Sequence, residues 1–209
     1  NEKIRVIIPV HLYGFPCDME RICKLAKKYN LNVIEDCSQS HGTTFNKKKV
    51  GSFGDLSVFS FYPTKSLGGY GDAGMICTDI EEYKIKLRKL RFYGIESNYS
   101  ADIDGYNSRM DEIQAAILNY KLKKLDDNIF SRKKIAEKYY KNIKSSLIEP
   151  IPQPNNSSCS YYQIPFYFKK NRNSFLKDLE FNGVKANVCY KTPIHLMPAY
   201  KNLGYKKGD

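Results

Sequence analysis

The sequence predicts an α/β fold whose main sheet is mostly parallel, and three observations support this prediction. Short apolar, β-branched segments alternate with helical patterns through the first half of the 209-residue chain. A helical stretch joins the first two of these segments, as in a βαβ unit, whose two strands are parallel. Hydrophobic residues make up 42% of the chain and charged residues 27%, as in an ordinary globular protein with an apolar core.

The first half of the chain divides into four predicted strands and two predicted helices. The strands are residues 5–10, 32–36, 56–61 and 74–78. The first helix, residues 18–29, begins at an Asp cap, and its apolar residues recur at helical spacing. The second helix is predicted over residues 81–93. Residues 94–107 are rich in Ser, Asn, Asp and Gly, so we expect a long exposed loop there.

The second half begins with a helical pattern from residue 109 to about residue 146, with a break expected near Asp126–Asn128. The proline-rich segment 150–156 cannot continue a helix. Beyond it we expect strands at 161–168 and near 184–189, with a helix at 174–182. The predicted domains are a large domain over residues 1–126, a connecting helix over 127–149 and a small α+β domain over 150–209.

The charge and cysteine content exclude several classes of protein. The net charge is +12, but the cations are scattered along helices and match no nucleic-acid motif, so we expect solvated helix faces and no nucleic-acid partner. No apolar run approaches the roughly 18 residues that cross a bilayer, and we expect no membrane association. The six cysteines form no CxxC pair and no zinc spacing, so we expect buried thiols in a reducing cytoplasm and no metal.

Two residues indicate the chemistry of a Schiff-base enzyme. Lys65 lies in a short apolar turn punctuated by Pro63, Gly68 and Gly69, where loss of water favours an unprotonated, nucleophilic amine. Asp36 ends an apolar strand, where open α/β sheets place their ligand-binding groups. The ordinary alternatives are a surface lysine and an acid that caps a turn. The glycines after Lys65 lack the spacing of a nucleotide-binding loop and predict a tight turn.

Seven segments, in order along the chain, resemble the DegT/DnrJ/EryC1/StrS family of nucleotide-sugar aminotransferases, which use pyridoxal 5′-phosphate (PLP). This family has the aspartate aminotransferase fold, PLP-transferase fold type I. The resemblance implies that the chain holds part of the PLP-binding large domain followed by part of a smaller α+β domain. Its matching segments are residues 9–14, 34–42, 51–55, 59–65, 71–74, 105–112 and 193–200.

The resemblance also implies roles for individual residues. Lys65 is the catalytic lysine that joins the PLP aldehyde, and Asp36 faces the pyridine nitrogen and keeps it protonated. Gln39 donates a hydrogen bond to the phenolic oxygen of PLP. Ser60 binds the phosphate, together with Asn107 from the other subunit, so the enzyme is a homodimer with shared active sites. For Asn107 an ordinary loop amide is an equal alternative.

Three further residues are assigned to the surroundings of this site. The resemblance suggests that Tyr13 and His195 contact the substrate and that His41 lies behind Asp36. The histidines at positions 11, 41 and 195 have no metal-ligand spacing, and a structural role is an open alternative for each of them.

The function implied is transfer of an amino group, from glutamate as the expected donor, to a keto group of a nucleotide-linked deoxysugar. The residues after Lys65 resemble relatives that aminate C3 of dTDP- or UDP-3-keto sugars, and amination at C4 is the alternative. From the resemblance, we expect that a large N-terminal part of the PLP domain and a C-terminal tail are not included in these 209 residues. A catalytically incomplete fragment or a PLP-less relative with a binding or dimerisation role is therefore another alternative.

Overall fold

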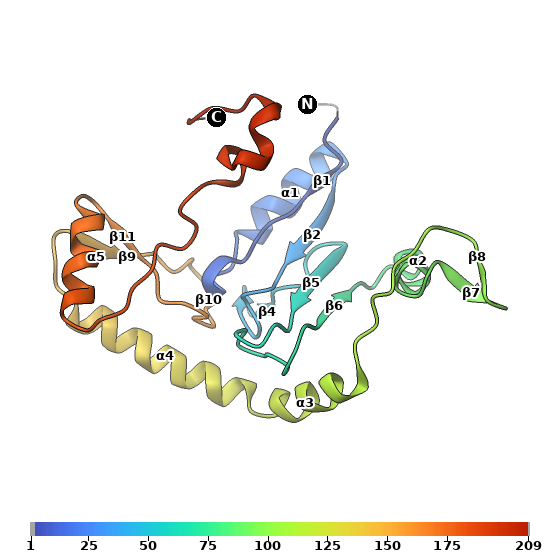
Figure 1. The fold of residues 1–209 in the computed structure, drawn as a ribbon, viewed down its shortest axis with the longest axis horizontal. Helices are drawn as coiled ribbons and strands as arrows, with labels where there is room; N and C mark the ends of the chain where they lie inside the picture. Colours follow the sequence, from blue (N-terminus) through green and yellow to red (C-terminus); the bar gives the residue numbers. More distant parts are fainter. Residues whose placement is uncertain (1–2, 209) are drawn as a thin grey trace. The chain divides into compact units, whose positions relative to one another are not determined.

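The computed structural model describes residues 3–208, which form two compact units (Figure 1). The first unit contains the chain up to residue 145 together with residues 150–166. The second unit contains residues 146–149 and the chain from residue 167 onward. The predicted domain boundaries at residues 126, 149 and 150 stay a prediction.

A four-stranded sheet forms the centre of the first unit. Its order is β1 (Val6–Ile7), β2 (Asn32–Asp36), β5 (Leu56–Ser60) and β6 (Gly74–Cys77). The strands β1, β2 and β5 are parallel, whereas β6 runs antiparallel to β5. The predicted α/β fold with a mainly parallel sheet is therefore confirmed. The first strand is shorter than expected, although Val10 still forms a parallel bridge with Asp36.

The helix α1 (Met19–Tyr29) connects β1 to β2 and lies alongside them in Figure 1. The side chain of Asp18 caps it by accepting a hydrogen bond of 3.1 Å from the backbone N–H of Arg21. At the other end, Asn30 adopts the left-handed conformation that ends many helices. The inner face of α1 buries Met19 and Ala26 against Val33 of β2, and this apolar cluster is the main core of the unit.

A second, three-stranded sheet was not predicted from the sequence. It has the order β10 (Ser157–Ser158), β3 (Thr44–Phe45) and β4 (Lys48–Lys49). All its pairings are antiparallel, and β10 pairs with β3 across more than one hundred residues of sequence. The sheet brings the segment around residue 160 back to the loop that follows β2.

The helices of the first unit follow the prediction with two corrections. The helix α2 (Glu81–Arg91) is present, but the expected loop after it contains a hairpin of β7 (Ile95–Ser97) and β8 (Ser100–Ala101). The long helical region divides into α3 (Glu112–Leu122) and α4 (Leu125–Asn142). The break lies at residues 123–124, because Asp126 and Asp127 occupy the first turn of α4, where the helix dipole favours acidic side chains.

Two apolar clusters pack these helices beside the sheet. Leu118 of α3 and Leu125 of α4 are buried against Phe61 and Leu67, on either side of Lys65 in the sequence. Ala136 of α4 is buried against Phe15, Cys159 and Tyr161. The turn that carries Lys65 is therefore supported by α3 and α4.

The second unit is small and holds the last helix, α5 (Arg172–Phe181), with the short helices η2 (Ile194–Leu196) and η3 (Pro198–Leu203). The strands β9 (Ile148–Pro150) and β11 (Phe166–Phe168) pair in a two-stranded sheet. The prediction of a strand near residues 184–189 was wrong, since these residues, all of them described, form no strand.

Cys189 is exposed, contrary to the prediction of buried thiols, while Cys37 and Cys159 are buried. Among the described residues, no helix has the length and apolarity that a membrane crossing requires.

Candidate active site

The carboxyl ends of two neighbouring parallel strands bring Asp36 and Ser60 to the same edge of the sheet. Asp36 is the last residue of β2 and pairs with Val58, two residues before Ser60 at the end of β5. The Asp36 carboxylate is half-buried, and its Oδ1 accepts a hydrogen bond of 2.9 Å from the backbone N–H of Ser38. Ser60 Oγ accepts one of 3.3 Å from the backbone N–H of Tyr62. This is the edge at which open α/β sheets bind ligands.

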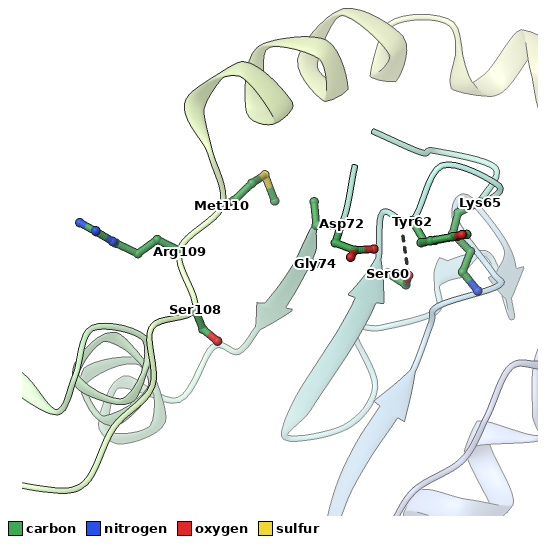
Figure 2. A pocket seen from close by; sticks show the side chains of 9 residues that line it. Ser60, Tyr62, Lys65, Asp72, Gly74, Ser108, Arg109 and Met110 are labelled. Carbon is green, nitrogen blue, oxygen red and sulfur yellow. Dashed lines mark hydrogen bonds between the residues drawn. The ribbon is translucent and has the colours of Figure 1, made fainter. Parts of the chain in front are cut away.

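A cavity of about 560 Å³ opens beside Ser60. One wall comes from the end of β5 and the segment after it, and the other from the residues just before α3 (Figure 2). Figure 2 shows Lys65 on the side of the cavity opposite Arg109 and Met110. The residues that line it are Ser60, Tyr62, Lys65, Asp72, Ala73, Gly74, Ser108, Arg109 and Met110.

Lys65 lies on a tight turn that only glycine allows to close. The backbone N–H of Lys65 donates to the carbonyl oxygen of Tyr62 at 2.9 Å, and that of Gly69 donates to Phe61 at 2.8 Å. A Cβ atom at Gly68 would lie 2.6 Å from the carbonyl oxygen of Pro63, so a larger residue would force the turn open. The predicted glycine turn beside Lys65 is therefore present.

Glu35 points to the opposite face of β2, as strand alternation predicts, and is fully buried. Its Oε1 accepts from the backbone N–H groups of Phe53 and Gly54 at 2.6 and 2.7 Å. Its Oε2 accepts from the N–H of Gly51 at 2.7 Å and from His11 Nε2 at 3.0 Å. Burial acts to raise the pKa of Glu35, but these four hydrogen bonds outweigh it, so the pKa is lowered and the buried carboxylate stays charged.

His11, Glu35 and Cys37 each place one potential metal-ligand atom within 4.8 Å of the others. The hydrogen bonds to Glu35 already use both of its oxygens. His11 uses both ring nitrogens, because its Nδ1 accepts from the backbone N–H of Cys17 at 3.0 Å. Burial raises the pKa of the Cys37 thiol to about 12. The cluster is therefore a hydrogen-bonded support for β2 and the loop before β5, and its chemistry does not favour a metal.

Tyr13 and Gln39, both predicted site residues, are joined directly. The backbone N–H of Tyr13 donates to Gln39 Oε1 at 2.7 Å, and Gln39 is 8% exposed. Because the oxygen of the amide serves Tyr13, a hydrogen bond from Gln39 to a ligand would come from Nε2. Tyr13 has the strained left-handed backbone conformation, with φ of 63°. Its ring packs on the cluster around Phe15, so a substrate contact by Tyr13 stays a prediction.

His41 is buried at 3% exposure between the rings of Phe59 and Phe61, with both ring centroids 5.7 Å away. Neither ring nitrogen has a hydrogen-bond partner that satisfies the usual geometry. Burial is the main cause that lowers the pKa of His41 to about 4; interaction with the backbone of Ser60 opposes this shift, and the charge of Lys65 adds to it. His41 is therefore a buried, neutral imidazole below the strand end that carries Ser60, and its predicted place behind Asp36 stays a prediction.

Asn107 and His195 are the two predicted site residues that lie away from these contacts. Asn107 is exposed and forms a bridge with Phe92 at the end of α2, beside the cavity residue Ser108. His195 belongs to the second unit, where its ring lies 6.2 Å from that of Tyr205. The roles of both residues stay predictions.

One contact of Lys65 was missed from the sequence. Its Nζ lies 5.1 Å from the centre of the Tyr162 ring, although the two residues are almost one hundred positions apart. Tyr162 was part of a predicted strand and carried no site signal. The cavity residues Asp72 and Arg109 lay in segments that matched the family, but no role was predicted for either.

Comparison with known proteins identifies the family and the fold. The sequence matches the DegT/DnrJ/EryC1/StrS aminotransferase family over residues 1–209. It is 43% identical to a dTDP-3-amino-3,6-dideoxy-alpha-D-galactopyranose transaminase from Aneurinibacillus thermoaerophilus, over 96% of this chain and 55% of that protein. It is 40% identical to a "pleiotropic regulatory protein" from Geobacillus stearothermophilus, over 100% of this chain and 57% of that protein.

A solved structure gives the same result for the fold. The crystal structure of S. venezuelae DesV in complex with a ketimine intermediate has a TM-score of 0.92 and 34% identity, covering 98% of this chain and 55% of that one. The chain spans about half the length of the curated relatives it matches. It has the fold of part of a type I PLP-dependent aminotransferase, and it belongs to the DegT/DnrJ/EryC1/StrS aminotransferase family.

Proposed function

We propose that the full-length protein is a PLP-dependent aminotransferase that moves an amino group from an amino acid to a keto group of a nucleotide-linked deoxysugar. Glutamate is the proposed donor. The observation that carries the proposal is the position of Lys65 at a cavity of about 560 Å³ beside Ser60, at the sheet edge where Asp36 also ends its strand. Family membership supports the same reaction.

The residues at this edge fit PLP by the chemistry of their donors and acceptors. An amine, a carboxylate and a hydroxyl correspond to the aldehyde, the pyridine nitrogen and the phosphate of the cofactor. When bound, PLP supplies an electron-withdrawing ring that stabilises negative charge on the neighbouring carbon. Lys65 would hold the aldehyde carbon, Asp36 the protonated ring nitrogen, Ser60 the phosphate and Gln39 Nε2 the phenolic oxygen.

The chain's own groups would also move and hold the protons of the reaction. Lys65 Nζ, when unprotonated, would be the base that takes the proton from the substrate carbon. The Asp36 carboxylate would accept a hydrogen bond from the ring N–H and so would hold that proton in place. Glu35, one residue earlier, supports the strand from the opposite face, and its four hydrogen bonds hold the end of β2 in position.

For the acceptor we propose C3 of a dTDP- or UDP-linked 3-keto sugar. The support is the 43% identity to a transaminase whose name gives a 3-amino sugar. The proposed experiment incubates the full-length protein with PLP, ¹⁵N-glutamate and nucleotide-linked 3-keto and 4-keto sugars. We expect ¹⁵N at C3 of the product by NMR. Label at C4 only would overturn the C3 assignment, and no transfer to any keto sugar would overturn the proposed substrate class.

We also propose that the enzyme is a homodimer in which Asn107 reaches the phosphate site of the other subunit. The support is that Asn107 is exposed beside Ser108 but does not line the cavity of its own chain. Analytical ultracentrifugation of the full-length protein tests the dimer. Mixing Lys65→Ala and Asn107→Ala subunits tests the sharing, because a mixed dimer keeps one intact site and regains activity. No recovery of activity on mixing would contradict shared sites.

A role in binding without catalysis is the second candidate. It is motivated by the 40% identity to a relative named as a regulatory protein. This candidate predicts that the full-length protein with added PLP forms no covalent adduct on Lys65. Formation of that adduct, with transfer of ¹⁵N, would exclude it.

A further inference from the structure

We propose that Tyr162 is a positioning residue for Lys65, and that its ring holds the Lys65 ammonium group at the wall of the cavity when no cofactor is bound. The inference rests on the proposed function of Lys65. Lys65 has a long, flexible side chain, and an amine that must both bond to a cofactor and carry a proton needs a defined location. Tyr162, which is not among the residues that line the cavity, supplies that defined location.

The contact is an ammonium over an aromatic face. Lys65 Nζ lies 5.1 Å from the centroid of the Tyr162 ring, within the range in which the ring quadrupole attracts a cation. The hydroxyl oxygen of Tyr162 lies 3.4 Å from Thr64 Oγ1, next to Lys65 in the sequence. The tyrosine therefore touches both residues of the turn, one through its ring and one through its hydroxyl.

The backbone of Tyr162 is held by side chains from distant parts of the first unit. Arg132 Nη1, on α4, donates to the carbonyl oxygens of Tyr161 and Tyr162 at 3.3 Å each. One residue further back, Ser160 Oγ lies 2.9 Å from Thr43 Oγ1, and both side chains are fully buried. A flexible lysine is therefore placed against a ring whose own position is fixed.

Gly14 allows this segment to approach the sheet. It has φ of 89°, and a Cβ atom there would lie 2.9 Å from the backbone nitrogen of Tyr162 and 2.6 Å from Ser160 Oγ. The backbone N–H of Ser160 also donates to the carbonyl oxygen of Gly14 at 3.1 Å. Tyr13 and Gly14 thus lie against residues 160–162, the segment that holds Tyr162 in position.

The test measures how fast Lys65 reacts with acetic anhydride, peptide by peptide, in the full-length protein without PLP. The attraction to the ring must be broken before the amine reacts, so Tyr162→Leu should accelerate the labelling of Lys65 about threefold to fivefold. Tyr162→Phe keeps the ring and should label at the wild-type rate. Tyr139→Leu, at an exposed tyrosine of α4, is the matched control and should leave Lys65 unchanged.

A second measurement follows the proposed reaction in the PLP-loaded protein. Tyr162→Leu should lower kcat several-fold with little change in the KM of glutamate, and Tyr162→Phe should restore kcat. Two results would overturn the inference. One is that Lys65 is labelled at the same rate in the wild type and in Tyr162→Leu, and the other is that Tyr162→Phe is labelled as fast as Tyr162→Leu. Failure of the proposed function has a different signature, the absence of a pyridoxyl adduct on Lys65 in the wild type.

Discussion

Replacing Glu35 by Gln tests whether the buried carboxylate supports the strand that ends at Asp36. Oε1 accepts from two backbone N–H groups at 2.6 and 2.7 Å, and Oε2 accepts from a third at 2.7 Å and from His11. An amide keeps one acceptor oxygen and turns an N–H₂ group toward the donors of the other, so two donors lose their acceptor. Hydrogen bonds to charged groups contribute about 1.5–3 kcal/mol each, while the amide avoids the cost of burying a charge.

We therefore expect Glu35→Gln to lower the free energy of unfolding by about 3 kcal/mol at pH 7. Urea denaturation of the full-length protein, followed by circular dichroism, measures this loss. Glu137→Gln, at an exposed glutamate of α4, is the matched control and should change the free energy by less than about 0.5 kcal/mol. A loss below about 0.5 kcal/mol for Glu35→Gln would show that the buried carboxylate does not support the strand.

The same carboxylate predicts a dependence on pH. Its pKa is lowered from the ordinary 4.5, so the unfolded chain takes up the proton first as the pH falls. The stabilisation from Glu35 is fully present above that ordinary value and is lost as the pH falls through the folded pKa. The difference between the wild type and Glu35→Gln should therefore be largest near neutrality and shrink on acidification. A constant difference from pH 7 to pH 3 would contradict this assignment.

Three further predictions concern residues of the candidate site. The pKa of His41 is lowered from 6.5 to about 4, so the free energy of unfolding of the wild type should fall by up to ~3 kcal/mol as the pH falls from 6.5 to 4. His41→Phe should lose less stability over the same range, and equal losses in urea titrations would contradict this prediction. Gly14→Ala should cost about 2 kcal/mol or more, because its Cβ atom would lie 2.9 Å from two backbone nitrogens, and an unchanged melting temperature would rule this out. Asp36→Asn should weaken PLP binding about tenfold to one hundredfold in absorbance titrations, whereas unchanged affinity would argue against the ring-nitrogen role.

The parts of the fold that depend on local sequence were predicted well. The helix α1 has an Asp cap that accepts from the backbone N–H of Arg21, an apolar face and a left-handed Asn at its end, and all three are readable from nearby residues. The strand β2 has the predicted bounds. The position of Asp36 followed from these elements, because the carboxyl ends of parallel strands meet at one edge.

The errors in the fold have two physical causes. The break between α3 and α4 was predicted at Asp126–Asn128, but Asp126 and Asp127 lie in the first turn of α4, where acidic side chains stabilise a helix. In the same way, the hairpin of β7 and β8 was predicted as a loop, although Asn98 and Tyr99 have the positive φ values of a tight hairpin turn. The prediction of a strand near residues 184–189 was wrong because a strand forms only beside another strand, and sequence periodicity does not reveal such a partner.

The contacts around Lys65 could not be predicted from the sequence for a similar reason. The ring of Tyr162 reaches Lys65 only because β10 pairs with β3 and because Arg132 and Gly14 hold the segment between them. Each of these contacts joins residues that are far apart in the chain. A sequence motif or a hydrophobic periodicity contains no information about contacts between distant residues. The carboxyl end of a parallel strand, in contrast, is expected to lie beside the carboxyl ends of the adjacent strands.

The proposed function requires the amine of Lys65 to form a covalent bond to PLP. The most direct measurement adds PLP to the full-length protein, reduces it with borohydride and maps the modified peptides by mass spectrometry. We expect one stoichiometric pyridoxyl group on Lys65, which should be absent from the Lys65→Ala variant at unchanged thermal stability. An unmodified Lys65 peptide in the wild type, or a pyridoxyl group spread over surface lysines, would contradict it.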